Sequence, residues 1–257
     1  MGGTQSHAPR SSARGGALPR AVFVLVAGCW ALALAVFLTG LGPRISHDHL
    51  IKHGPPLPLA GLIFVLGWTV MVGAMMLPPA LSATRVVNDP PSRAAAARFL
   101  GVFTLVWVAF GAVLFVADIG IHTTVDHTPW LSAHPWLIGA GTLAVAGLAQ
   151  LTPLKSRLLV LCREPGRHRR ADEGPGLFGA RHGLACLGSD GPLMLAMFGA
   201  GIAQVTWMVA LTAVMLYEVR GTHFRYLQYS LAALLLVWAA LMAAHPAWLP
   251  AVLASLT

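Results

Sequence analysis

Residues 67–79 read GWTVMVGAMMLPP and close an apolar run that starts near Leu57 and contains no charged residue. This run is about 20 residues long, which is enough for a helix to cross roughly 30 Å of hydrocarbon. At helical spacing Trp68, Met71 and Met75 share one face, and the Pro pair is expected to end the helix. The stretch therefore predicts a helical membrane protein that carries two thioethers on one side of a helix.

The composition supports a chain that is solvated by lipid. Hydrophobic residues make up 56% of the sequence and charged residues only 10%, whereas a soluble domain has about 25% charged residues. The net charge of +8 could indicate a nucleic-acid partner. The basic residues, however, lie in the connections between apolar runs, which is typical of cytoplasmic loops. We therefore expect the lipid bilayer as partner and no nucleic acid.

The apolar runs predict an all-α, multi-pass bundle of six transmembrane helices. A disordered cytoplasmic tail is expected at residues 1–19, followed by a single domain at residues 20–257. The expected helices cover residues 21–41, 57–82, 94–119, 134–150, 182–217 and 229–244, joined by loops at 43–56, 84–92, 120–133, 163–181 and 219–228. Pro153 is expected to kink the chain after the fourth helix, with an amphipathic extension that reaches Cys162.

The distribution of basic residues predicts the orientation. With the N-terminus inside, 13 of the 17 Lys and Arg residues fall on the inner side, and only Arg44, Lys52, Arg220 and Arg225 fall outside. The positive-inside rule then places both termini in the cytoplasm. The high content of Ala, Gly and Arg indicates a bacterial source, so the expected location is the plasma (inner) membrane.

This topology gathers imidazoles and carboxylates on the outer side. Seven of the eleven histidines fall there, namely His47, His49, His53, His122, His127, His134 and His223. Asp118 and His122 are four residues apart and share a helix face, and His134 opens the next helix. Imidazole with carboxylate is a common ligand set for zinc, copper and iron. The alternative interpretation is that these groups are solvated loop residues.

The methionines suggest a second, softer set of ligands. Met71 and Met75 lie in the inner half of the second expected helix, and Met194 and Met197 in the inner half of the fifth. Thioethers select Cu(I), although methionines at this spacing also form ordinary packing seams. The seam of the fifth helix ends at Glu218, which we expect at the outer end, close to the histidines. Asp190 is expected at the inner mouth of this helix, where the helix dipole favours a carboxylate.

Several motifs together resemble a known family. They are Trp68-x-x-Met71-x-x-x-Met75 with the following Pro, Gln150-x-x-Pro153 with Cys162-Arg163, and Gly183-x-x-Cys186 with Glu218. The chain is similar to the bacterial domain-of-unknown-function family described as predicted metal-binding integral membrane proteins. That resemblance implies a multi-pass inner-membrane protein that handles a metal. Members commonly have Cys-Cys where this chain has Ser189-Asp190, so Cys162 is expected to stand alone and an inner thiolate site is not expected.

The sequence thus leads to a hypothesis with two alternatives. The leading hypothesis is binding or trafficking of a transition metal, with copper favoured, as an accessory factor for other membrane or periplasmic metal-handling proteins. Asp118, His122 and His134 would form an outer site, and the four methionines an inner one. The alternatives are a metal-dependent oxidase or monooxygenase-like enzyme and a structural subunit of a membrane complex. The sequence does not decide whether the protein is an enzyme.

Overall fold

A computed structural model describes residues 17–87, 92–170, 172–199 and 205–245. The expected tail at residues 1–19 therefore falls almost entirely outside the described part of the chain. The described residues form helices and no strand, in agreement with the all-α prediction. The helices are α1 (Ala17–Leu38), η1 (Gly42–Ile45), α2 (His47–Lys52), α3 (Leu57–Met75), α4 (Leu77–Thr84), α5 (Arg93–His127), α6 (Pro129–Ser132), α7 (Trp136–Leu151), α8 (Pro153–Arg163), α9 (Pro165–His168), α10 (Pro175–Gly199), α11 (Val205–Arg220) and α12 (Phe224–Ala244).

Four of these helices are long and apolar enough to cross a membrane. They are residues Arg20–Leu38 of α1, together with α3, α5 and α12. The pair α7 and α8 would make a fifth crossing, although the two helices meet at an angle of 70°. Pro153 opens α8 at this bend, and Thr152 caps the new helix by accepting a hydrogen bond from the backbone N–H of Lys155. The kink predicted at Pro153 is therefore present.

Three of the expected boundaries were wrong. The second helix ends at Met75, and the Pro pair then opens the short helix α4 instead of closing α3. Helix α5 continues to His127, so most of the expected loop at 120–133 is helical. The expected loop at 43–56 contains the 3-10 helix η1 and the two-turn helix α2.

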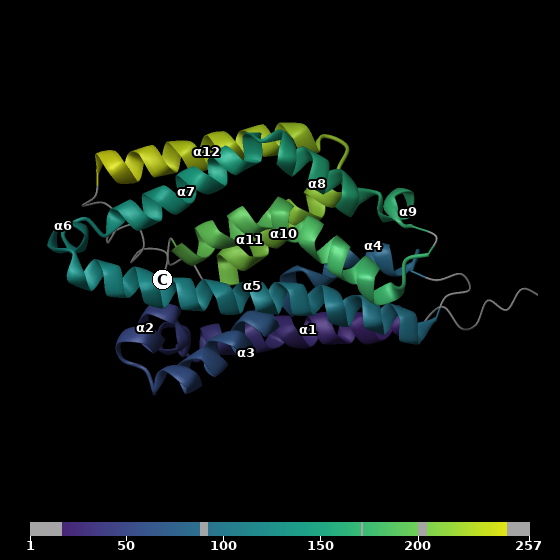
Figure 1. The fold of residues 1–257 in the computed structure, drawn as a ribbon, viewed down its shortest axis with the longest axis horizontal. Helices are drawn as coiled ribbons and strands as arrows, with labels where there is room; N and C mark the ends of the chain where they lie inside the picture. The colour runs from purple at the N-terminus through teal and green to yellow at the C-terminus, as the bar shows by residue number, and fades with distance from the viewer. Residues whose placement is uncertain (1–16, 88–91, 171, 200–204, 246–257) are drawn as a thin grey trace, which may run out of the picture.

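The largest difference concerns the expected fifth helix at 182–217, which is two helices. As one continuous helix, Asp190 and Glu218 would be about 42 Å apart. Instead, Lys155 contacts both carboxylates, with its Nζ 2.8 Å from Glu218 Oε2 and 3.4 Å from Asp190 Oδ1. Helices α10 and α11 therefore run back along each other as a hairpin, which lies in the middle of the bundle between α5 and the α7–α12 pair (Figure 1).

The hairpin changes which residues share an end of the bundle. Arg163, at the end of α8, donates hydrogen bonds to the carbonyl oxygens of Glu218 and Gly221, and its guanidinium lies 4.4 Å from the ring centroid of Phe224. The connection from α11 to α12 therefore lies with the basic segment that follows α8. Glu218, Arg220, His223 and Arg225 were expected at the end of the bundle that holds the other histidines, whereas this connection lies beside Arg163 at the end of α8. Figure 1 also shows that α1 starts at one end of the bundle and α12 finishes at the other.

Aromatic side chains fix the packing of α1, α3 and α5. The indole N–H of Trp68 on α3 donates to the carbonyl of Trp107 on α5 at 2.8 Å, and that of Trp30 donates to the carbonyl of Ala74 at 3.1 Å. Trp68 and Trp107 are both buried. Gly111 makes room for Trp68, because a Cβ at this position would lie 2.4 Å from the indole ring. This contact sets the distance between α3 and α5.

We predict that Gly111→Ala destabilises the fold by about 1–3 kcal/mol, the usual cost of overpacking a tight contact. The matched control is Gly101→Ala on the same helix, where a Cβ would meet nothing within 4 Å. That change should be neutral or slightly stabilising, because Ala favours the helix over Gly by up to about 1 kcal/mol. The measurement is the thermal unfolding midpoint of both variants in detergent. Equal midpoints would contradict the close approach of Trp68.

The buried ion cluster gives a second prediction. Lys155→Ala leaves the carboxylates of Asp190 and Glu218 buried without their cation, which typically costs about 3–5 kcal/mol. The expected fall in the unfolding midpoint is more than about 6 °C. Arg157→Ala, an exposed cation on the same helix, is the control and should leave the midpoint unchanged. Equal stability of the two variants would show that Lys155 does not hold the hairpin in place.

Candidate metal centre

Helix α2 carries two of the residues that form the candidate centre. Ser46 starts this helix, because its hydroxyl accepts a hydrogen bond from the backbone N–H of His49. Asp48 lies in the first turn, where a carboxylate is favoured by the free N–H groups. Leu50 is buried and anchors the helix to the core. His47 and Asp48 are thereby held beside the C-terminal half of α5.

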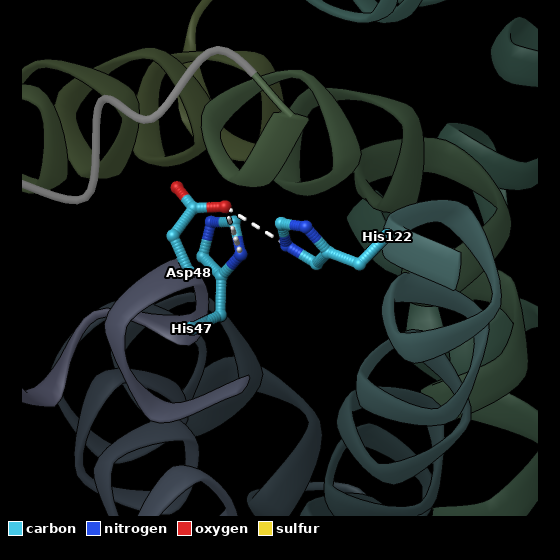
Figure 2. Close-up of side chains that lie close together, drawn as sticks. All are labelled: His47, Asp48 and His122. Atoms are coloured by element: carbon cyan, nitrogen blue, oxygen red, sulfur yellow. Dashed lines mark ion pairs between the residues drawn. The ribbon is translucent and has the colours of Figure 1, made fainter. Parts of the chain in front are cut away.

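Four ligand atoms meet between α2 and α5. His47 Nδ1 lies 2.9 Å from Asp118 Oδ2 and 3.6 Å from Asp48 Oδ1. His122 Nε2 lies 3.0 Å from Asp48 Oδ1 and 3.7 Å from Asp118 Oδ2. The ligand atoms of His47, Asp48 and His122 all lie within 4.8 Å of one another, and Figure 2 shows these three side chains directed toward one another from the two helices. Asp118 Oδ2 contacts both imidazoles of this group.

The chemistry of this group fits a divalent cation. His122 Nε2 is buried and, although two carboxylate oxygens face it, makes no hydrogen bond to the described residues. Its polar neighbours are these carboxylate oxygens, of which Asp48 Oδ1 lies 3.0 Å away, and a cation could bridge the imidazole and the carboxylates. With neutral imidazoles the four groups carry two negative charges, which one divalent cation would neutralise. Two imidazoles with two carboxylates form a donor set suited to Cu(II), zinc or iron.

The four side chains are exposed to solvent to different degrees. The exposed fractions are 8% for Asp118, 10% for His47 and 14% for His122, but 58% for Asp48. Three donors are therefore held in the protein, while one carboxylate reaches the surface. An ion could enter and leave past Asp48 without displacing the other three side chains.

His134, the third residue of the predicted outer site, lies apart from this group. Its Nδ1 is 2.7 Å from the carbonyl oxygen of Trp130, and its ring packs against the indoles of Trp130 and Trp136. The structure thus groups His122 with His47 and Asp48, places Asp118 in contact with both imidazoles, and does not place His134 with them.

The four methionines of the predicted inner site lie in the apolar core. Met75, Met194 and Met197 are buried and Met71 is half-buried. Met71 and Met75 are on α3, which packs on α1, α5 and α11, whereas Met194 and Met197 are on α10, which packs on α5, α7 and α8. Both helices thus pack on α5, and all four methionines belong to one apolar cluster. This arrangement accounts for them as packing residues, and a copper-binding role stays a prediction.

Glu218 does not lie near the histidines. It pairs with Lys155 beside Asp190, at the end of the bundle where α8 and α9 lie. The sequence also led us to expect that Cys162 stands alone, which was wrong. Its Sγ lies 2.9 Å from Cys186 Sγ, and both thiols are buried. The available signal was that both cysteines border the same basic segment, so a turn within it could bring them together.

A hollow between α5, α6 and α7 bears on the enzyme hypothesis. Ala117, Ile121, Thr124, Leu131 and Ile138 line it. The α5 residues among these lie on a different face of the helix from Asp118 and His122. The hollow therefore does not open on the ligand group, and this geometry does not favour an enzyme that oxidises a substrate bound there.

Comparison with known proteins agrees with a metal-related role. A sequence model of the PpoB2 family, described as copper chaperone, matches residues 65–242. No curated protein and no solved structure gives a significant match. The matched region is well over half of the chain and includes Asp118 and His122. The chain therefore belongs to the family described as copper chaperones.

Proposed function

We propose that the protein is an integral membrane protein that binds copper at the group formed by His47, Asp48, Asp118 and His122. The observation that carries this proposal is the convergence of ligand atoms from His47, Asp48 and His122 beside the buried carboxylate of Asp118. Among divalent first-row metals, such nitrogen and oxygen sites bind Cu(II) most strongly. The family description supports copper as the cargo.

Each residue has a distinct part in holding this cargo. Asp118 is the buried carboxylate that fixes the His47 ring through Nδ1, and His122, one turn further along α5, supplies the second imidazole. Asp48 completes the donor set from the surface side. A centre with one exposed ligand can pass its ion to another protein by exchanging that ligand first. We therefore expect periplasmic or membrane metal-handling proteins as partners.

The hairpin supports a proposal for the number of crossings in a bacterial plasma membrane. We infer five crossings, by α1, α3, α5, the bent pair α7–α8 and α12, while α10 and α11 enter from one end and return to it. Exposed apolar side chains such as Leu105, Val113 and Val116 on α5 would face lipid. Arg220 and Arg225 then join the cytoplasmic side, which strengthens the positive-inside asymmetry. The centre would face the periplasm, and the C-terminus would lie opposite the N-terminus.

Copper binding tests the centre directly. Metal-free protein in detergent is titrated with Cu(II), and bound metal is measured by elemental analysis and electron paramagnetic resonance. His122→Ala removes one ligand and should weaken Cu(II) binding by at least about 10- to 100-fold. Changing a residue that only hydrogen-bonds to a metal ligand already weakens binding by about that factor. His134→Ala should bind as the unmodified protein does, because its Nδ1 is directed at Trp130 rather than at the centre.

The pair of variants separates the geometry seen here from the set expected from sequence. If His134→Ala loses Cu(II) binding and His122→Ala keeps it, the centre formed by His47, Asp48, Asp118 and His122 is rejected. A spectrum without nitrogen hyperfine coupling in the unmodified protein would reject imidazole ligation. Thermal midpoints of both variants serve as the control for folding.

Reporter fusions test the orientation. Alkaline phosphatase is active only in the periplasm and green fluorescent protein fluoresces only when folded in the cytoplasm, so each fusion reports one side. With five crossings, a C-terminal phosphatase fusion should be active, while an N-terminal fluorescent fusion should be bright. The six-crossing topology expected from the sequence predicts a bright C-terminal fluorescent fusion and an inactive phosphatase, which would contradict the hairpin as a re-entrant element.

A further inference from the structure

A pair of cysteines, whose sulfurs are softer ligands than those of the candidate centre, lies at the opposite end of the bundle. Cys162 is near the end of α8 and Cys186 is in the middle third of α10, and their sulfurs are 2.9 Å apart. The exposed fractions of the two residues are 2% and 6%. Two buried thiols from different helices, with sulfurs in contact, form a preorganised pair.

The two helices that carry the pair pack closely. Helix α8 lies along α10, and a Cβ at Gly188 would come within 2.4 Å of Leu158, so this glycine lets the two helices approach closely. Lys155 on α8 and Asp190 on α10 join the same two helices through their ion pair at 3.4 Å. Positions 186 and 190 are one turn apart, so Cys186 and Asp190 share a face of α10. The thiols are therefore held together by groups on both sides.

The charged groups near the pair balance one another. Lys155 pairs with Asp190 and Glu218, and Arg163 directly follows Cys162 and is fixed to the carbonyls of Glu218 and Gly221. The two cations and the two carboxylates cancel. The charged groups therefore add no net charge to the pair, and burial keeps the two thiols protonated until a metal binds. The surroundings thus permit two sulfur ligands to lose their protons when a metal binds.

We propose that Cys162 and Cys186 form a second metal site, specific for a soft monovalent cation of the Cu(I) class. Thiolates are soft ligands that select Cu(I), zinc or iron–sulfur clusters. Structural zinc and cluster sites use four ligands, whereas a pair of sulfurs suffices for Cu(I). On binding, each thiol releases its proton as a sulfur–copper bond forms, and copper keeps its oxidation state. This site is distinct from the His and Asp centre, which has only nitrogen and oxygen donors.

The test is a Cu(I) titration of the reduced full-length protein without oxygen, in competition with the chelator bathocuproine disulfonate. The variants are Cys162→Ser, Cys186→Ser and the double change. The control is Cys29→Ser, which removes the third cysteine, on α1, away from the pair. The proposal predicts that each variant of the pair binds one equivalent less Cu(I) than Cys29→Ser. It also predicts sulfur neighbours of copper in the X-ray absorption spectrum of Cys29→Ser.

Cu(II) binding by the same variants separates this site from the outer centre. The variants of the pair should keep that binding, which also shows that they are folded. The proposal is overturned if the double variant takes up as much Cu(I) as Cys29→Ser, or if the spectrum shows only nitrogen and oxygen neighbours. A thiol count gives a further test, in which the folded protein is reduced, the reductant is removed, and the protein is then unfolded. A count of one free thiol in place of three would overturn the proposal, because Cys162 and Cys186 would then form a disulfide that resists reduction.

Discussion

The contact of Lys155 with Asp190 and Glu218 determines much of this architecture. An ammonium and two carboxylates can be buried in an apolar bundle only if they meet, because each charge alone would cost several kcal/mol. These three residues come from α8, α10 and α11, so satisfying them requires the end of α11 to come back to the middle of α10. The reversal in turn places the end of α11 beside Arg163, and it leaves α12 to run to the far end of the bundle.

The sequence predicted those parts of the fold that depend on local pattern. Apolar runs of sufficient length indicated α1, α3, α5 and α12, and Pro153 indicated the bend between α7 and α8, because proline opens a helix but does not continue one. The hairpin could not be predicted in this way. The spacing of Met194, Met197, Met208 and Met215 suits one long helix as well as two antiparallel ones, since the core-facing period is the same. The decisive ion pair joins residues 63 positions apart.

The same distinction applies to the metal centre. Asp118 and His122 are one turn apart on a helix, so their proximity follows from helical geometry alone. His47 reaches them across 71 residues, from a helix of only six residues, which is too short to show a periodic pattern. His134 was expected with them because it follows α5 closely in sequence. Helix α6 takes up that connection, and the local bond to Trp130 fixes the imidazole away from the centre.

The family match covers one candidate site completely and the other only in part. Residues 65–242 include Asp118, His122, Cys162 and Cys186, but they begin after α2 and therefore omit His47 and Asp48. Half of the outer donor set thus comes from a segment that the family pattern does not describe, whereas the thiol pair and the ion cluster lie wholly within it. A copper-related family would be expected to keep its metal chemistry inside the shared region. On that reasoning the thiol pair is the candidate site that lies wholly within the region matched by the family, whereas α2 lies before it.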